Sequence, residues 1–181
     1  MSKSLKKFIS LALFAALSGC GYSTQSLLPA HIRTVHVEPV VSTINFSSEV
    51  SDKERFRVYR PGVEVDITNA IINRFIFDGN LKSTTDPAKA DAILKTKLVD
   101  YRRDPLRYTD DDEVTEYRLS IVIDATFYDA QTHKVLWHEA SLTGDTTFFL
   151  SGPHALSEDE AVVKAVEDLA KRVVDRTIEL W

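Results

Sequence analysis

Histidine, cysteine and clustered acidic residues are the side chains of this chain that could do chemistry. The five histidines do not have the helix spacing of a zinc site, and His138-Glu139 is only a fragment of the H-E-x-x-H motif. Asp110 to Asp112 form an acidic run without the spaced oxygen ligands of a calcium loop. No G-x-S-x-G elbow and no phosphate-binding glycine motif occurs. The sequence therefore predicts a protein that is not an enzyme and has no metal site.

The one cysteine, Cys20, points to a different chemistry. A short basic segment and an apolar run over residues 8–17 precede it, which is typical of a signal peptide and too short to span a bilayer. Leu17-Ser18-Gly19-Cys20 resembles the bacterial lipobox. The resemblance implies that signal peptide 1–19 is removed and that Cys20 carries covalent lipid, with no other cofactor expected. The alternative is a free cysteine in a secreted or buried segment.

The residue after the cysteine bears on the membrane to which the lipid would be directed. In enterobacterial lipoproteins an aspartate at this position retains the protein at the inner membrane, and here the residue is Gly21. This resembles an outer-membrane address. Two or three acyl chains would hold the protein there firmly, since each buried methylene contributes about 0.8 kcal/mol.

Length and charge limit what the mature chain is. Removing residues 1–19 from 181 leaves 162 residues, and the formal charge changes from −5 to −8 because three basic residues leave (19 − 27). A net acidic chain argues against nucleic acid as a partner. Residues 20–31 are predicted to be a lipidated N-terminus and short tether, and residues 32–181 a single domain. With its one cysteine lipidated, this domain has no disulfide and depends on packing.

Hydrophobic periodicity predicts the elements that must position any site. Alternating patterns predict strands at 32–41, 81–85, 92–103, 114–128 and 134–149. Three- and four-residue spacing predicts amphipathic helices at Val63–Asp78, ended by Gly79, and from a capping box at Ser157 and Glu160 to about Glu179. The remaining long segments, 42–61 and 104–113, are predicted to be loops, and 129–133 a hairpin turn.

Two helices that each need an apolar surface predict a two-layer α+β sandwich with both helices on one sheet face. The other face would be open or covered by a partner. Strict alternation in the strand at 92–103 places Lys95, Lys97 and Tyr101 on the same face. Phe75 and Phe77 of the first helix are expected in the core. An exposed sheet face on a membrane-tethered protein favours a partner over a substrate.

Short motifs along most of the mature chain resemble the lipopolysaccharide-assembly lipoprotein family LptE. They are Cys20-Gly21-Tyr22-Ser23, Leu28-Pro29 before Ile32-Arg33-Thr34-Val35, the helix start Gly62-Val63-Glu64-Val65-Asp66-Ile67-Thr68-Asn69-Ala70, Ala90-Asp91-Ala92-Ile93-Leu94, Tyr101-Arg102-Arg103-Asp104-Pro105-Leu106 and Val114-Thr115-Glu116-Tyr117-Arg118-Leu119. The resemblance implies two helices on a four-stranded mixed sheet. The loop at 42–61 and the last hairpin do not match residue by residue, so no functional side chain is transferred from the family.

The same resemblance implies a function in the outer membrane, with the domain facing the periplasm and the lumen of an LptD-like β-barrel. The implied partners are that barrel, for which the chain would be plug and chaperone, and lipopolysaccharide. Basic residues on neighbouring strands and their connecting loop are the candidates for its phosphates or carboxylates: Lys95, Lys97, Arg102, Arg103, Arg107 and Arg118. The alternative is a pilotin-like or other structural accessory lipoprotein of another envelope machine, which binds no glycolipid.

Overall fold

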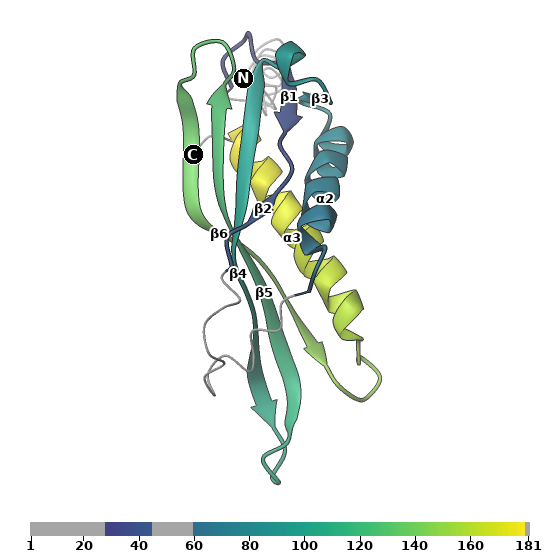
Figure 1. Ribbon diagram of the computed structural model, residues 1–181. Coiled ribbons are helices and arrows are strands. Elements are labelled where there is room, and N and C mark those ends of the chain that lie inside the picture. The colour runs from purple at the N-terminus through teal and green to yellow at the C-terminus, as the bar shows by residue number, and fades with distance from the viewer. Residues whose placement is uncertain (1–27, 45–59, 180–181) are drawn as a thin grey trace, which may run out of the picture.

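A mixed β-sheet and two long helices make up the part of the chain that the structure describes (Figure 1). The structure is a computed structural model, and it describes residues 28–44 and 60–179. The predictions for the signal segment 1–19, for Cys20 and for most of the 42–61 loop fall outside these residues.

Six strands form the sheet, in the order β3-β1-β4-β5-β6, with β2 pairing to β4 as well. Their bounds are β1 Thr34–Val37, β2 Val41–Ser42, β3 Lys82–Ser83, β4 Ala92–Tyr108, β5 Val114–Asp129 and β6 Val135–Phe149. The first three run parallel to their neighbours, whereas β4, β5 and β6 are antiparallel. The predicted α+β class and mixed sheet are confirmed, but the expectation of four strands is wrong.

The sequence patterns predicted five strands, and the sixth arises because the predicted strand at 32–41 is divided into β1 and β2. Glu38 still donates its backbone N–H to the carbonyl of Leu94 at 2.9 Å. Pro39 has no N–H to continue the ladder. Val40 then donates its N–H to the Thr68 hydroxyl of the helix at 3.0 Å. The two short strands therefore pair with separate parts of β4.

Strand β4 differs from the prediction in length and in phase. It continues through Asp104–Tyr108, which was predicted to be loop, because that segment pairs with the start of β5. A register shift between Leu98 and Asp100 inserts one extra residue. This bulge turns Tyr101 to the core side, so the expectation that it shares a face with the lysines is wrong.

Both helices lie where periodicity predicted them. Helix α2 spans Val63–Asp78 and ends at Gly79, which adopts the left-handed conformation (φ 79°) and donates its N–H to Phe75 at 3.0 Å. Helix α3 spans Glu158–Glu179. The predicted capping box is confirmed: Ser157 N–H donates to Glu160 at 2.8 Å, and Glu160 N–H donates to the Ser157 hydroxyl at 3.2 Å.

The core lies between the helices and one face of the sheet, as predicted (Figure 1). Ile121, Ile123 and Leu169 are among its fully buried side chains. Helix α3 lies very close to β6 at Gly144, where a Cβ atom would lie 2.4 Å from the Cβ of Leu169 and 2.5 Å from the Ala165 carbonyl oxygen. Glycine at this position therefore lets the helix rest directly on the strand backbone.

Strand β6 is the outer strand of the sheet next to β5. Helix α3 reaches part of its free edge, because the Asp145 N–H donates to the Asp168 carboxylate at 3.1 Å. Arg172 bonds to the same carboxylate at 2.8 Å and to Asp145 at 3.4 Å. The β5–β6 ladder is also interrupted by two register shifts, which bend the edge.

The described domain has two distinct ends (Figure 1). At one end lie β1, β3, the short 3-10 helix η2 (Pro87–Lys89), the turn between β5 and β6, and the C-terminal end of α2. At the other end the β4–β5 hairpin projects beyond both helices. Ion pairs of Arg60 with Asp159 at 2.7 Å and of Arg74 with Asp175 at 3.8 Å show that α2 and α3 run in the same direction.

Candidate functional site

The sheet face opposite the helices carries five of the six predicted basic residues. We call this surface the open sheet face. Lys95, Lys97, Arg102 and Arg107 lie on it from β4, and Arg118 lies on it from β5. They alternate with buried residues of the covered face, which fixes their direction. The structure therefore brings these five cations onto one surface.

Carboxylates from the same face and its rim partner most of these cations. Lys95 lies 3.3 Å from Glu38, Arg102 lies 3.2 Å from Asp100 and 3.3 Å from Asp104, and Arg107 lies 3.5 Å from Glu116. Among the described residues, Lys97 and Arg118 form no ion pair. Positive and negative side chains therefore alternate on the open sheet face. Because an exposed pair contributes only about 0 to 1 kcal/mol, a ligand anion can displace its carboxylate at small cost.

Lys95 is held by more than its carboxylate partner. Its ammonium lies 5.2 Å from the centre of the Tyr128 ring. Hydrogen bonding to Tyr128 and then to Glu38 raises the pKa of Lys95 above its ordinary value. The side chain therefore stays charged and in place on the open sheet face.

Arg103, the sixth predicted residue, lies on the covered face. It is 2.6 Å from Glu158 in the first turn of α3, and its guanidinium lies 4.7 Å from the centre of the Tyr117 ring. Nearby, burial raises the pKa of the Tyr101 hydroxyl to about 12. Arg103 thus joins a helix to the sheet, and the structure does not bring it together with the other five cations.

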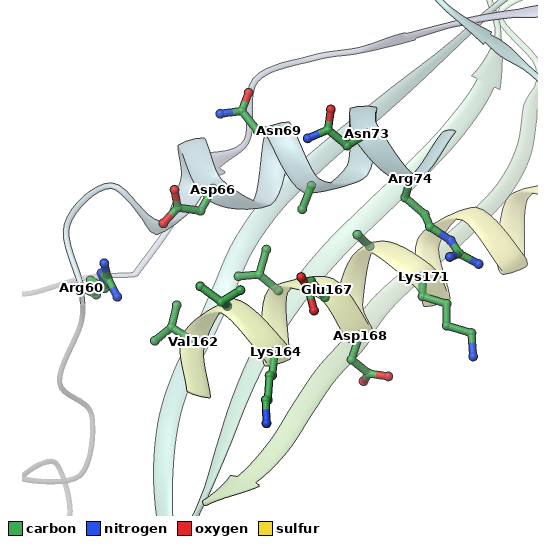
Figure 2. A pocket seen from close by; sticks show the side chains of 14 residues that line it. Arg60, Asp66, Asn69, Asn73, Arg74, Val162, Lys164, Glu167, Asp168 and Lys171 are labelled. Atoms are coloured by element: carbon green, nitrogen blue, oxygen red, sulfur yellow. The ribbon is translucent and has the colours of Figure 1, made fainter. Parts of the chain in front are cut away.

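A groove of about 800 Å³ runs between α2 and α3 on their outer side (Figure 2). Asp66, Asn69 and Asn73 line it from α2, and Lys164 and Lys171 line it from α3. Amides and charges of both signs alternate along it, so it has no single ligand preference. None of the predicted basic residues lies in this groove.

The described residues contain no group of three histidine, cysteine or acidic side chains arranged to hold a metal ion. Neither α2 nor α3 has the length and apolar character that a membrane-crossing helix needs.

Two acids, the buried Asp129 and the partly buried Asp91, fix the start of the domain to the sheet. Asp129 lies 2.6 Å from His31 and also accepts the N–H groups of Gln131 and Thr132 at 2.8 Å. These bonds lower the pKa of Asp129 to about 2, with the Thr132 N–H as the largest cause and His31 next. Asp91 accepts the N–H groups of Arg33 and Thr34 at 3.0 Å. The chain therefore enters the domain at a firmly held point.

Phe77 is a surface residue that the sequence reasoning assigned wrongly to the core. Phe75 is fully buried as expected, whereas 80% of Phe77 is exposed, together with 63% of Ile76. Residues two apart on a helix point about 200° apart, because each residue turns about 100°. Periodicity alone therefore excludes burying both aromatic rings on one face, and that signal was available in the sequence.

Comparisons with known proteins agree with this architecture. No curated protein matches the chain by sequence. Protein XCC0632 from Xanthomonas campestris is similar in structure, with a TM-score of 0.52 at 11% identity, over 83% of this chain and 88% of that one. Protein CT253 from Chlamydia trachomatis has a TM-score of 0.50 at 13% identity, over 80% of this chain and 95% of that one. At such identities these structures show a shared fold alone.

The sequence itself carries a family signal over most of its length. The model of the LptE family, described as lipopolysaccharide-assembly, matches residues 32–177. That range includes all six strands, the whole of α2 and nearly all of α3. The resemblance drawn from the short motifs is therefore confirmed, and the chain belongs to the LptE family of lipopolysaccharide-assembly proteins.

Proposed function

We propose that this chain is a lipoprotein of the outer membrane that plugs and helps assemble an LptD-type β-barrel and assists lipopolysaccharide insertion at the cell surface. The family match over residues 32–177 is the observation that carries the proposal. Acyl chains on Cys20 hold the protein at the membrane, and the domain faces the periplasm and the barrel lumen. In this role the domain binds partners and catalyses no reaction.

The open sheet face is the surface that suits such a partner. Three long antiparallel strands build it, and both helices lie on the other side (Figure 1). Its alternating charges form specific polar contacts with a barrel wall without a large net field. A rigid sheet also keeps these charges at fixed spacing, which favours one docking orientation.

Within this face, Lys97 and Arg118 are the strongest candidates for the phosphates of lipopolysaccharide. Neither forms an ion pair among the described residues, so a phosphate can bind either one without first displacing an ion-paired carboxylate. The acidic residues opposite them in the β4–β5 register are Asp124 and Asp104. The guanidinium of Arg118 can bind two phosphate oxygens at once. Lys95, Arg102 and Arg107 have to exchange a carboxylate first, and Arg103 serves to position α3.

Co-purification from outer membranes tests the partner. A tagged, lipidated chain is expected to bring down an LptD-like barrel together with lipopolysaccharide. A chain that comes down with components of a different envelope machine and no barrel supports the alternative of a pilotin-like accessory lipoprotein. Recovery of the tagged chain without any crosslinked partner contradicts both the barrel-plug function and the pilotin-like alternative.

Charge reversal tests the glycolipid contact separately. Lys97→Glu with Arg118→Glu is expected to lower the lipopolysaccharide that co-purifies several-fold, because two unpaired cations become repulsive anions. Lys164→Glu with Lys171→Glu on α3 is the matched control with the same change in net charge. Equal loss in both double variants shows an effect of net charge, and no loss in the first pair removes the open sheet face as the lipopolysaccharide site.

A further inference from the structure

At the C-terminal end of α2, two large apolar side chains of consecutive residues are exposed. Phe77 is 80% exposed and Ile76 is 63% exposed, in the last turn before Gly79. The guanidinium of Arg74 lies 5.3 Å from the centre of the Phe77 ring. An aromatic ring beside a cation on an exposed helix end is the kind of group that is stable between headgroups and acyl chains.

Exposed basic residues surround this helix end. Arg33 precedes β1, Lys82 lies on β3, Lys89 ends η2 and Lys134 follows the β5–β6 turn, and all four are exposed. These segments meet in space, since β3 pairs with β1 and the Ala130 N–H donates to the Asp91 carbonyl at 2.8 Å. Cations therefore reach solvent from several elements at one end of the domain. We call these four residues with Ile76 and Phe77 the α2 end.

Most acidic groups near the α2 end are turned inward or already engaged. The carboxylates of Asp91 and Asp129 accept backbone N–H groups within the domain. Asp78 accepts from Asn80 at 2.8 Å, and Asp86 caps η2 and pairs with Lys89 at 3.2 Å. The four basic side chains thus dominate what an approaching surface meets.

The opposite end of the domain has the reverse character. The turn of the β4–β5 hairpin contains Asp110, Asp111, Asp112 and Glu113 and no basic residue. An anionic surface repels this tip and attracts the α2 end. The charge distribution by itself therefore orients the domain on such a surface.

The tether selects the same orientation. Cys20 lies eight positions before Leu28 (28 − 20), the first described residue, so a fully extended link reaches roughly 26 to 29 Å at about 3.3 to 3.6 Å per residue. Leu28 leads directly into β1 through a turn in which the Ile32 N–H donates to the Pro29 carbonyl at 2.9 Å. An anchor at Cys20 therefore keeps this end of the domain close to the bilayer.

We infer that the α2 end docks on the anionic phospholipid headgroups of the leaflet that holds the Cys20 anchor, with Phe77 entering the boundary between headgroups and acyl chains. The inference rests on the acylation of Cys20 proposed above. The tether supplies proximity, and the α2 end supplies a second contact that fixes the orientation. The acidic hairpin tip then points away from that leaflet.

An environment-sensitive probe on the full lipidated chain tests this contact. Because acylation consumes the thiol of the one native cysteine, a cysteine introduced by Phe77→Cys takes a nitrobenzoxadiazole label selectively. Tyr108→Cys is the matched control, since Tyr108 is also an exposed aromatic residue, 52% exposed, at the opposite end. Both chains are reconstituted into vesicles of phosphatidylethanolamine and phosphatidylglycerol. We expect label emission to rise several-fold and shift to the blue at position 77 and to stay water-like at position 108.

The outcomes separate the anchor from the docking contact. A chain that does not float with the vesicles lacks the lipid anchor, which overturns the proposed anchoring and this inference together. Floating chains with equal, water-like emission at both positions overturn only the docking. Emission at position 77 that changes only after a barrel partner is added shows that the partner's wall covers Phe77, which also overturns docking on lipid. Lys82→Glu with Lys89→Glu is expected to reduce the signal at position 77, whereas Lys164→Glu with Lys171→Glu leaves it unchanged.

Discussion

Arg102 and Arg103 are neighbours in sequence, yet they belong to opposite faces of the sheet. Arg102 lies on the open sheet face between Asp100 and Asp104. Arg103 lies on the covered face, where it contacts Glu158 of α3 and the Tyr117 ring. The two faces differ in the same way over much of β4 and β5, since one packs apolar side chains under the helices and the other holds the ion pairs of Lys95, Arg102 and Arg107. Stability is therefore concentrated on one face, which leaves the other free to bind.

The largest test of this contrast is a cavity in the covered face. Ile121→Ala removes a fully buried side chain, and it is expected to lower the free energy of unfolding by about 2 to 5 kcal/mol. Arg118→Ala on the same strand faces the other way, and it is expected to change it by at most about 0.5 kcal/mol. Urea denaturation measures both. Similar losses in the two variants would break the distinction between the faces.

The close contact between α3 and β6 gives the second test. A methyl group at Gly144 would lie within 2.6 Å of atoms of Leu169 and Ala165, including helix backbone. Gly144→Ala is expected to cost about 1 to 3 kcal/mol of stability, because the helix has to move outward. Thr147→Ala, at an exposed position of the same strand, is the control. An unchanged denaturation midpoint for Gly144→Ala would show that α3 does not pack as described.

The two neighbouring arginines give the third and sharper test. Arg103→Ala removes a 2.6 Å ion pair and the packing against Tyr117, which together are expected to contribute about 1 to 2 kcal/mol. Arg102→Ala is expected to cost less than about 1 kcal/mol, since its pairs are exposed. Thermal denaturation of the two variants under identical conditions compares them directly. A larger loss of stability for Arg102→Ala than for Arg103→Ala would contradict the assignment of Arg103 to the covered face, and with it the position of the bulge in β4.

Acid titration tests the carboxylate that holds the start of the domain. The folded-state pKa of Asp129 is lowered to about 2 from 3.8, so its contribution to stability is complete above pH 3.8 and is lost as pH falls toward 2. The unfolding free energy of the native chain is therefore expected to fall more steeply over this window than that of Asp129→Asn. Asp124→Asn, which alters a more exposed Asp–His pair at 3.1 Å, serves as the control. Identical slopes for the native chain and Asp129→Asn would contradict the assignment.

The sequence predicted those features that depend on residues close together in the chain. Both helices have the expected bounds, because Gly79 and the Ser157–Glu160 box are local signals. The β5–β6 hairpin follows from alternation in the same way. The break in the first strand had a local signal in Pro39, whereas the bulge after Leu98 depends on how β4 pairs with β5. Local periodicity does not contain that information.

The candidate site was predictable in type but not in arrangement. Basic residues on neighbouring strands were predicted as a group, and five of the six share a face. The long-range carboxylate partners were not foreseen, since Glu38 lies 57 positions before Lys95 and Glu158 lies 55 positions after Arg103. A single inserted residue in β4 also separated Arg103 from the others. Strand pairing between distant segments thus decides whether a set of basic residues forms a purely positive surface or is paired with carboxylates.

The partly covered edge of β6 bears on whether copies of this protein associate with one another. Lipoproteins anchored in one leaflet diffuse in two dimensions, so copies collide far more often than they would in solution. A straight, unpaired strand invites a neighbouring copy to extend the sheet, which leads to aggregation. Here the Asp145 N–H donates to the carboxylate of Asp168, and two register shifts bend the strand. Helix α3 therefore engages one edge donor of β6, which disfavours extension of the sheet by a second copy at that position, and it leaves the opposite face of the sheet uncovered.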